Sequence, residues 1–349
     1  MILILILISF GCLWWERDIT AVDPGNGLWQ FIAAMNEFST VLKAVVPVFG
    51  IALVGLFIRK LNWLSEEADQ SLLKVNINLL LPCLILDSAL GNPALSRLSN
   101  LVLAPAVGIG TLLLGVGVAL AARPLHGLVE RKEARTFALS VGMYNYGYIP
   151  LPLSILLFDK ETTGVLLVHN VGVETALWTF GVMLLTGGSL GKDWRKIING
   201  PLIAIVVAVL LNELGWHDRL PETVRIAVHW LGQCAIPMAL ILIGAIVADH
   251  LAEFHSASGW RVIGTGFLLR LGLLPVLFLL LAKYLPCSLE LKRVIVLQAA
   301  MPAAVFPILM ARHYGGDPPT ALRVVISTSA ASLVTIPLWL RFGMRFVGV

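Results

Sequence analysis

Residues 145–152 read NYGYIPLP, and they stand inside an apolar stretch, residues 135–158, that is long enough to cross a lipid bilayer. Pro150 and Pro152 each lack a backbone donor, and each ring clashes with the carbonyl four residues earlier, so the stretch cannot run as one regular helix. Backbone freed at this depth is tolerated only where protein or a water-filled cavity satisfies it. The sequence therefore predicts a membrane-spanning helix that is interrupted near its middle.

The composition of the whole chain agrees with a membrane protein. Of 349 residues, 58% are hydrophobic and only 13% are charged, and the mean hydropathy is +0.88. Soluble proteins carry about 25% charged residues, so most of this surface must face lipid. The near balance of 25 Lys and Arg against 21 Asp and Glu indicates no nucleic-acid partner. The four cysteines have neither zinc-site nor disulfide-framework spacing, and we predict no metal and no cofactor.

Hydropathy predicts ten membrane-spanning segments, because a bilayer core needs about 20 apolar residues for each helix. They lie at 42–59, 72–90, 100–122, 135–158, 162–187, 200–214, 227–248, 260–284, 292–312 and 319–340. The first five form one predicted domain, 42–187, and the last five belong to a second, 200–349. A polar connector, 188–199, joins them and is predicted to be cytoplasmic. For residues 1–41 three interpretations stay open: a signal segment, an additional short helix, or an incorrect start.

The distribution of basic residues predicts the orientation of the chain in a plasma (inner) membrane. If residues before 42 lie outside, the inside loops of the first half hold ten Lys and Arg, against four outside. The second half is less decisive, because Lys283, Lys292 and Arg293 would lie outside. Both termini are predicted to lie outside the cytoplasm.

Matched prolines indicate an internal repeat. Four prolines of the first half are each followed by a counterpart 152 to 155 residues later, in the same order: Pro47 and Pro201, Pro82 and Pro237, Pro150 and Pro302, Pro152 and Pro307. A repeat of five helices must insert in opposite orientations, because five is odd. The sequence therefore predicts two inverted five-helix repeats, an arrangement common among secondary transporters.

The repeat predicts a second interrupted helix at residues 301–307, MPAAVFP. The N-terminal end of a half-helix at mid-membrane presents N–H groups and a positive dipole end, which favour an anionic ligand. Two such ends meeting near the midplane predict an anion site. The alternative is a pair of structural kinks that neighbouring helices pack against.

Three motifs carry a family resemblance: NYG at 145–147 followed by PLP at 150–152, AAMP at 299–302, and IPMAL at 236–240 ahead of IGA at 243–245. Over residues 46–340 the chain resembles the auxin efflux carrier superfamily, which includes bacterial malate permeases and the plant PIN-type auxin carriers. The resemblance implies a scaffold of segments 1, 2, 6 and 7, often a homodimer. The remaining segments would form a transport domain, whose fourth and ninth helices cross at their prolines and which moves like an elevator.

The substrate is expected at this crossing, where Asn145 has the position of the crossover asparagine in PIN-type carriers. Its amide can donate to a carboxylate without a permanent charge, although a hydrogen bond between helices is the alternative interpretation. The predicted substrate-binding residues are Asn145, Tyr146, Gly147, Pro150, Pro152, Gln298, Met301, Pro302, Ala303 and Pro307.

Two ionisable residues lie deep within predicted spans. Glu174 stands where PIN-type carriers resemble this chain but have Gln, and an intramembrane carboxylate is costly and usually functional. We predict that it binds or releases a proton during transport; the alternative is an ion pair with Arg270 and no transport role. Arg270 has three open roles: pairing with Glu174, capping carbonyls at a helix break, or attracting the substrate anion.

The sequence therefore predicts an all-α secondary transporter of small organic anions, either auxin-like acids or dicarboxylates. A sodium-coupled organic-acid symporter of related fold, or a channel or sensor that kept the carrier fold, remains an alternative. An enzyme is not predicted, because neither two facing Asp residues nor a zinc-binding His-Glu-x-x-His sequence is present.

Overall fold

The computed structural model describes residues 27–188, 195, 198–256 and 259–349. Much of the predicted N-terminal segment 1–41 and of the connector 188–199 lies outside these described residues. Contacts divide the chain into two compact units, Met1–Thr40 and Val41–Val349.

The elements of the first half are all helical. They are α2 (Gly27–Lys60), α3 (Glu66–Val75), the π-helix η1 (Asn76–Leu80), α4 (Leu81–Ala89), the 3-10 helix η2 (Pro93–Ser96), α5 (Leu98–Ala121), α6 (Arg123–His126), α7 (Arg131–Gly142), α8 (Pro150–Leu157), α9 (Lys160–Ala176), the π-helix η3 (Leu177–Gly181) and α10 (Val182–Thr186).

The second half is helical as well. Its elements are α11 (Gly200–Glu213), the 3-10 helix η5 (His217–Arg219), α12 (Glu222–Ser256), α13 (Trp260–Phe267), the π-helix η6 (Leu268–Leu273), α14 (Leu274–Tyr284), α15 (Leu289–Ala299), α16 (Phe306–His313) and α17 (Pro318–Val347). Within the described ranges the only β-type pairing is an isolated antiparallel bridge between Tyr144 and Ala303. The predicted all-α class is therefore confirmed.

Within the described residues, seven helical segments are long and apolar enough to cross a membrane. They are Val41–Lys60, Glu66–Ala89, Leu98–Ala121, Lys160–Thr186, Glu222–Asp249, Trp260–Tyr284 and Pro318–Val347. The other three predicted segments are shorter or divided. The sixth is α11, which has only 14 residues. The fourth stops at Gly142 and resumes at Pro150, and the ninth stops at Ala299 and resumes at Phe306, so both predicted interruptions are present.

Polar side chains fix where several of these helices begin. Ser65, Asp159, Asn199, Ser288 and Asp317 each accept a hydrogen bond from a backbone N–H in the first turn of the helix that follows. Such caps satisfy backbone N–H groups that have no partner inside the helix. Ser, Asp and Asn are among the residue types preferred at this position. Each cap therefore marks the point where a connecting segment gives way to a helix.

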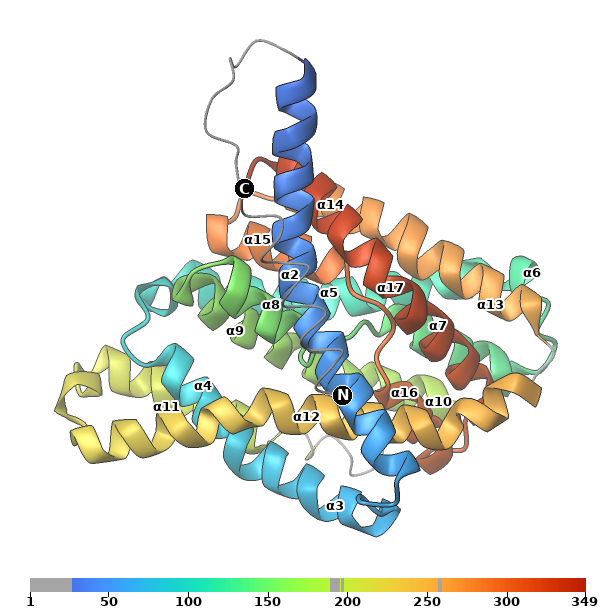
Figure 1. Ribbon diagram of the computed structural model, residues 1–349, viewed down its shortest axis with the longest axis horizontal. Helices are drawn as coiled ribbons and strands as arrows, with labels where there is room; N and C mark the ends of the chain where they lie inside the picture. The colour runs from blue at the N-terminus through green and yellow to red at the C-terminus, as the bar shows by residue number, and fades with distance from the viewer. Residues whose placement is uncertain (1–26, 189–194, 196–197, 257–258) are drawn as a thin grey trace. The chain divides into compact units, whose positions relative to one another are not determined.

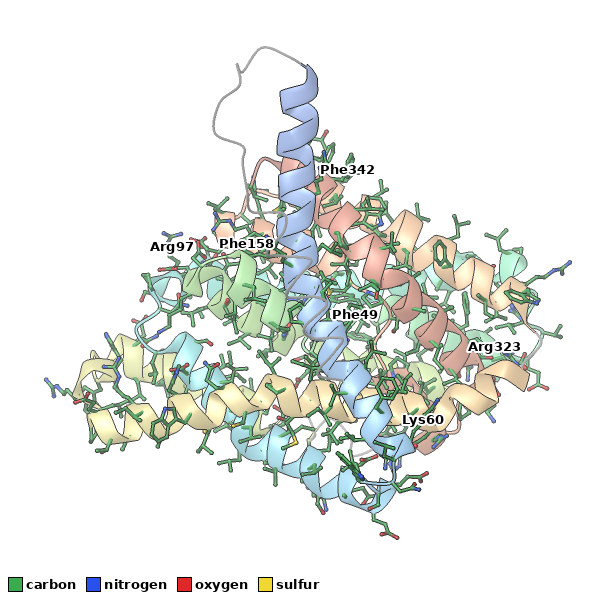
Figure 2. The ribbon with its side chains drawn as sticks, in the orientation of Figure 1. Phe49, Lys60, Arg97, Phe158, Arg323 and Phe342 are labelled. Atoms are coloured by element: carbon green, nitrogen blue, oxygen red, sulfur yellow. The ribbon has the colours of Figure 1, made fainter. Side chains whose placement is uncertain are left out.

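The helices pack into three groups, whose members are labelled in Figure 1. α4 packs against α11 and α12, whereas α5 packs against α7 and α9, and α17 packs against α13, α15 and α16. α9 and α17 also contact the first group, through α4 and α12 respectively. In Figure 2, the labelled cations Lys60 and Arg97 lie at the end of α2 and just before α5, outside the apolar middle of these helices.

Glycines allow two pairs of helices to approach closely. A Cβ atom on Gly108 would lie 2.3 Å from the carbonyl oxygen of His169, which brings α5 against α9. A Cβ atom on Gly244 would lie 1.8 Å from the carbonyl oxygen of Ala52, which brings α12 against α2. Small residues at such contacts let membrane helices pack backbone to backbone.

Two alanine substitutions on α5 are expected to differ in their effect on the free energy of unfolding. Gly108→Ala forces α5 away from α9 and should lower the free energy of unfolding by about 1–3 kcal/mol. Gly110→Ala, whose Cβ meets nothing within 4 Å, should be neutral or stabilise by up to about 1 kcal/mol, because alanine restricts the unfolded chain. Thermal unfolding of the purified protein in detergent measures both, and equal effects would contradict the described packing.

Candidate functional site

The two interrupted helices meet at their breaks. The N–H of Asn145 donates to the carbonyl of Pro302 at 2.8 Å, and the N–H of Ala304 donates to the carbonyl of Met143 at 2.9 Å. These two bonds form the antiparallel bridge between Tyr144 and Ala303. The breaks, which lie more than 150 residues apart in the sequence, therefore satisfy part of each other's freed backbone.

Hydrogen bonds within the protein also use backbone donors at the start of α8, where the anion site is predicted. At the start of α8, the N–H of Ile149 donates to Asn145 Oδ1 at 3.3 Å, and the N–H of Leu151 donates to the carbonyl of Gly147 at 2.9 Å. Pro150 and Pro152 have no N–H to offer. The first turn of α8 therefore has few donors left for a ligand, and side-chain amides become the main candidates.

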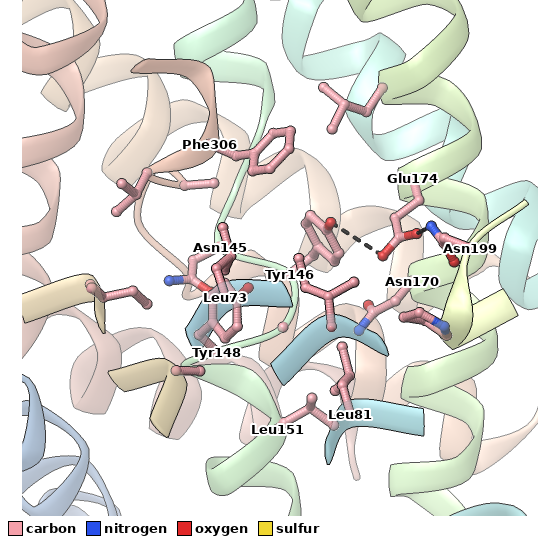
Figure 3. Close-up of a pocket in the computed structure, with 18 of the residues that line it drawn as sticks. Leu73, Leu81, Asn145, Tyr146, Tyr148, Leu151, Asn170, Glu174, Asn199 and Phe306 are labelled. Atoms are coloured by element: carbon pink, nitrogen blue, oxygen red, sulfur yellow. Dashed lines mark hydrogen bonds between the residues drawn. The ribbon is translucent and has the colours of Figure 1, made fainter. Parts of the chain in front are cut away.

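A cavity of about 240 Å³ lies beside the crossing. Its walls come from α3, η1 and α4, from the α7–α8 break, from α9 and η3, from α11 and α12, and from the start of α16 (Figure 3). Most of the wall is aliphatic or aromatic, and the aromatic side chains are Tyr146, Tyr148, Trp178 and Phe306. The polar lining side chains other than tyrosine and tryptophan are Asn145, Asn170, Glu174 and Asn199, and no Lys or Arg is among the described lining residues.

Glu174 is the single carboxylate among the described lining residues, and it accepts hydrogen bonds from two side chains. Its Oε1 accepts a hydrogen bond from the hydroxyl of Tyr146 at 3.4 Å, and its Oε2 accepts one from Asn199 Nδ2 at 2.6 Å (Figure 3). Tyr146 belongs to the break, and Asn199 caps α11. Glu174 therefore joins three parts of the chain at one point of the cavity wall.

Arg270 lies on the π-helix η6 and is completely buried. Its Nε donates to the carbonyl of Met301 at 3.0 Å, and its Nη2 donates to the carbonyl of Gln298 at 3.4 Å. The guanidinium carbon also lies 5.2 Å from the ring centre of Tyr144, within reach of a cation–π contact. Of its three predicted roles, the contacts match the capping of carbonyls at a helix break. Among the described residues no ion pair joins Arg270 to Glu174.

A buried chain of hydrogen bonds runs behind the cavity wall. Gln298 Nε2 donates to the carbonyl of Tyr146 at 3.1 Å and to Asn170 Oδ1 at 3.3 Å. His169 Nδ1 lies 3.4 Å from the same Asn170 oxygen, and its Nε2 lies 3.4 Å from the hydroxyl of Tyr144. This chain links α9, α15 and the α7–α8 break.

The predicted site residues divide into two groups. Asn145, Tyr146, Gly147 and Glu174 line the cavity. The other predicted residues are not part of its lining: Pro150, Pro152, Arg270, Gln298, Met301, Pro302, Ala303 and Pro307.

Sequence reasoning missed several lining residues, above all Asn170. Asn170 stands four residues before Glu174 on α9, and residues at this spacing share one helix face, so the spacing could have found it. Tyr148 and Phe306 lie inside the interrupted stretches 145–152 and 301–307, and Trp178 stands four residues after Glu174, so each could have been found beside a residue already singled out. Asn199 has no such signal, because only the fold brings it to Glu174.

The family match includes every residue of this site. The family described as "Membrane transport protein" matches residues 40–340. An "Uncharacterized transporter" of Methanothermobacter thermautotrophicus is 26% identical over 310 residues, which cover 87% of this chain and 98% of that protein. "Auxin efflux carrier component 8" of Arabidopsis thaliana is 29% identical over 191 residues, which cover 53% of this chain and 46% of that protein.

Proposed function

The chain belongs to the membrane transport protein family of auxin efflux carriers and is a membrane transporter, and we propose that it carries small organic acids through the cavity at the helix crossing. The observation that carries this proposal is the wall of that cavity. Amide side chains offer hydrogen-bond donors there, and apolar and aromatic side chains surround them. Ligand sites commonly combine such a wall with a few placed polar groups.

The lining favours one of the two predicted acid classes. A dicarboxylate would bring two negative charges to a wall that holds a carboxylate and no described Lys or Arg. Buried charges without partners are costly, so a doubly charged substrate is disfavoured. A monocarboxylic acid with an apolar or aromatic body can place its single charge on the amides and its body on the rings. This is the substrate class that we propose.

Glu174 supplies the proposed coupling to protons. Its carboxylate and the substrate carboxylate would share one small cavity, and two like charges at close range repel. Protonation of Glu174 removes that repulsion. The acid therefore binds together with a proton, and both leave on the other side of the membrane.

For the transport cycle we propose ten crossing segments in two inverted five-helix repeats. α2, α3–α4, α11 and α12 form the scaffold, and the remaining segments form a transport domain that moves in an elevator-like manner. The packing of α4 with α11 and α12, and of α5 with α7 and α9, supports this division. Glu174 on α9 and Asn199 on α11 would then face each other across the moving boundary.

Orientation and assembly are part of the same proposal. The protein is placed in the plasma (inner) membrane with both termini outside the cytoplasm, on the basis of its Lys and Arg distribution. A homodimer through the scaffold follows from the family resemblance. Cross-linking of single cysteines placed on α12, in native membranes, tests the dimer.

One observation favours a second candidate function. A cavity that is lined by one carboxylate and by the rings of Tyr146, Tyr148, Trp178 and Phe306 also fits an organic cation, which aromatic faces and a negative charge attract. The chain would then carry an amine rather than an acid, and Glu174 would be its counter-ion. The two candidates make opposite predictions about ligand charge.

Ligand-induced stabilisation separates these candidates. Purified protein is heated in detergent with aromatic monocarboxylates, dicarboxylates or aromatic amines, and the midpoint of unfolding is recorded. A ligand that binds only the folded state, at about 100 times its dissociation constant, adds roughly 2.7 kcal/mol of stability. We expect the monocarboxylates to raise the midpoint most. Stabilisation by amines alone would contradict the proposal.

A further inference from the structure

We propose that Asn170 is a substrate-carboxylate donor of this cavity, and that Gln298 and His169 are positioning residues that hold its amide with the N–H groups toward the substrate. The inference rests on the proposed function, because it assigns a role within the same acid site. Asn170 is 7% exposed and lines the cavity on α9, one helical turn from Glu174.

The backbone carbonyl of Tyr146, which can act only as an acceptor, fixes the orientation of the neighbouring amides. The Gln298 amide points to it at 3.1 Å, so the amide atom there must be the donor Nε2. The same Nε2 has a second hydrogen, which it directs at Asn170 at 3.3 Å. The atom of Asn170 that receives it must be an acceptor, and it is therefore Oδ1.

His169 adds a second donor to the same oxygen. Its Nδ1 lies 3.4 Å from Asn170 Oδ1, so the imidazole must carry a hydrogen on Nδ1 to make a favourable contact. Its Nε2 is then free to accept from the Tyr144 hydroxyl at 3.4 Å, and Thr111 Oγ1 lies 2.7 Å behind that hydroxyl. The donor and acceptor directions of these contacts are therefore mutually consistent and follow from the carbonyl of Tyr146. Gln298 Oε1 is buried and has no hydrogen-bond partner among the described residues.

The nitrogen of the Asn170 amide, Nδ2, is therefore left for the substrate. Both donors occupy Oδ1, and no described residue bonds to Nδ2. Nδ2 is not fully buried, and Asn170 lines the cavity, so this nitrogen reaches the cavity space. Asn145 is arranged alike, because its Oδ1 accepts from the N–H of Ile149 and its Nδ2 is left for a ligand.

Two amides with their oxygens occupied and their N–H groups directed at one cavity form a donor pair. Such a pair suits a carboxylate, which only accepts hydrogen bonds, and does not suit an ammonium group, which only donates them. Asn170 thereby becomes a determinant of specificity as well as affinity. Because Gln298 and His169 lie behind the wall, they act through Asn170 and do not touch the substrate.

The test compares an acid with its uncharged amide in the full-length protein. Phenylacetate and phenylacetamide have the same aromatic body, and their dissociation constants are measured for wild type and for Asn170→Asp. The substitution keeps the shape of the side chain but replaces the donor by an acceptor. We expect phenylacetate to bind about 30-fold more weakly, because a charge-assisted bond is lost and a like charge is added, whereas phenylacetamide, which can donate to the new carboxylate, should change by less than about threefold.

A matched control separates this effect from damage to the fold. Asn100 on α5 is 1% exposed and donates to the carbonyl of Ala94, away from the cavity, so Asn100→Asp introduces the same change at another buried asparagine. It should leave the acid-to-amide ratio unchanged. Gln298→Leu should weaken phenylacetate by about threefold to tenfold through the released Asn170 amide, with the maximal transport rate less affected than KM.

The outcomes are distinct. Equal weakening of acid and amide in Asn170→Asp, or no weakening of either, would overturn the role of Asn170 and leave the acid carrier standing. Failure of wild type to bind phenylacetate or any other monocarboxylate tested would overturn the proposed function, and the inference with it.

Discussion

Glu174→Gln is expected to uncouple transport from the proton gradient. Glutamine keeps the size of the side chain and one of its two accepting oxygens, so one of the two hydrogen bonds from Tyr146 and Asn199 loses its acceptor. Its amide can neither bind nor release a proton. A gradient of one pH unit is worth about 1.4 kcal/mol, so one coupled proton supports about tenfold accumulation of the acid. We expect the variant to accumulate none above equilibrium and to exchange substrate at a rate independent of pH.

One control for this variant keeps a titratable group at residue 174, and the other makes the same chemical change at a carboxylate elsewhere. Glu174→Asp retains a carboxyl group and should preserve part of the pH dependence. Glu290→Gln removes a carboxylate that pairs with Arg97 at the start of α15, outside the cavity lining, and it should leave accumulation unchanged. An unchanged rate and pH profile in Glu174→Gln would exclude this carboxyl group as the coupling site.

Arg270→Leu is expected to destabilise the helix crossing more than any other single change that we consider. It removes the donors to the carbonyls of Met301 and Gln298. The Gln298 carbonyl keeps the N–H of Met301 at 3.2 Å, whereas the Met301 carbonyl loses the donor that the structure shows for it, and a buried carbonyl without a partner costs about 1–3 kcal/mol. The loss should appear as a large fall in the midpoint of thermal unfolding and in the yield of folded protein. The unfolding midpoint of Arg270→Lys should lie between those of wild type and Arg270→Leu. An ammonium group keeps the charge, but it cannot present the fixed fork of the guanidinium to both carbonyls.

Arg261→Leu is the matched control, since Arg261 lies on α13, nine residues earlier, and is exposed. It should change the free energy of unfolding by no more than about 0.5 kcal/mol. If Arg270→Leu kept wild-type stability and lost acid binding, the guanidinium would be a substrate group and its carbonyl contacts would be incidental.

Local sequence patterns were sufficient to predict the interruptions but not their partners. The prolines at 150, 152, 302 and 307 predicted where the fourth and ninth segments stop being regular helices, because the effect of proline on its own backbone is local. The bond between the N–H of Asn145 and the carbonyl of Pro302 joins residues 157 apart. No local pattern specifies such a contact.

The same difference explains the polar residues of the site. Glu174 was recognisable because a carboxylate within an apolar span is costly by itself. Gln298 was predicted to bind substrate, but the structure places it behind the lining, where it donates to the carbonyl of Tyr146 and to Asn170. Arg270 could have paired with Glu174 by sequence alone, and only the packing of η6 beside α15 puts it on backbone carbonyls instead.

Proton-driven acid transport through the crossing is the central claim, and uptake into proteoliposomes tests it most directly. Labelled phenylacetate and an aromatic sulfonate, which stays charged and does not leak as a neutral acid, are supplied under an imposed proton gradient or an imposed sodium gradient. We predict saturable uptake with counterflow that follows the proton gradient and ignores sodium, at up to about tenfold accumulation per pH unit. Uptake that follows sodium, that fails to saturate, or that favours organic cations over both anions would contradict the claim.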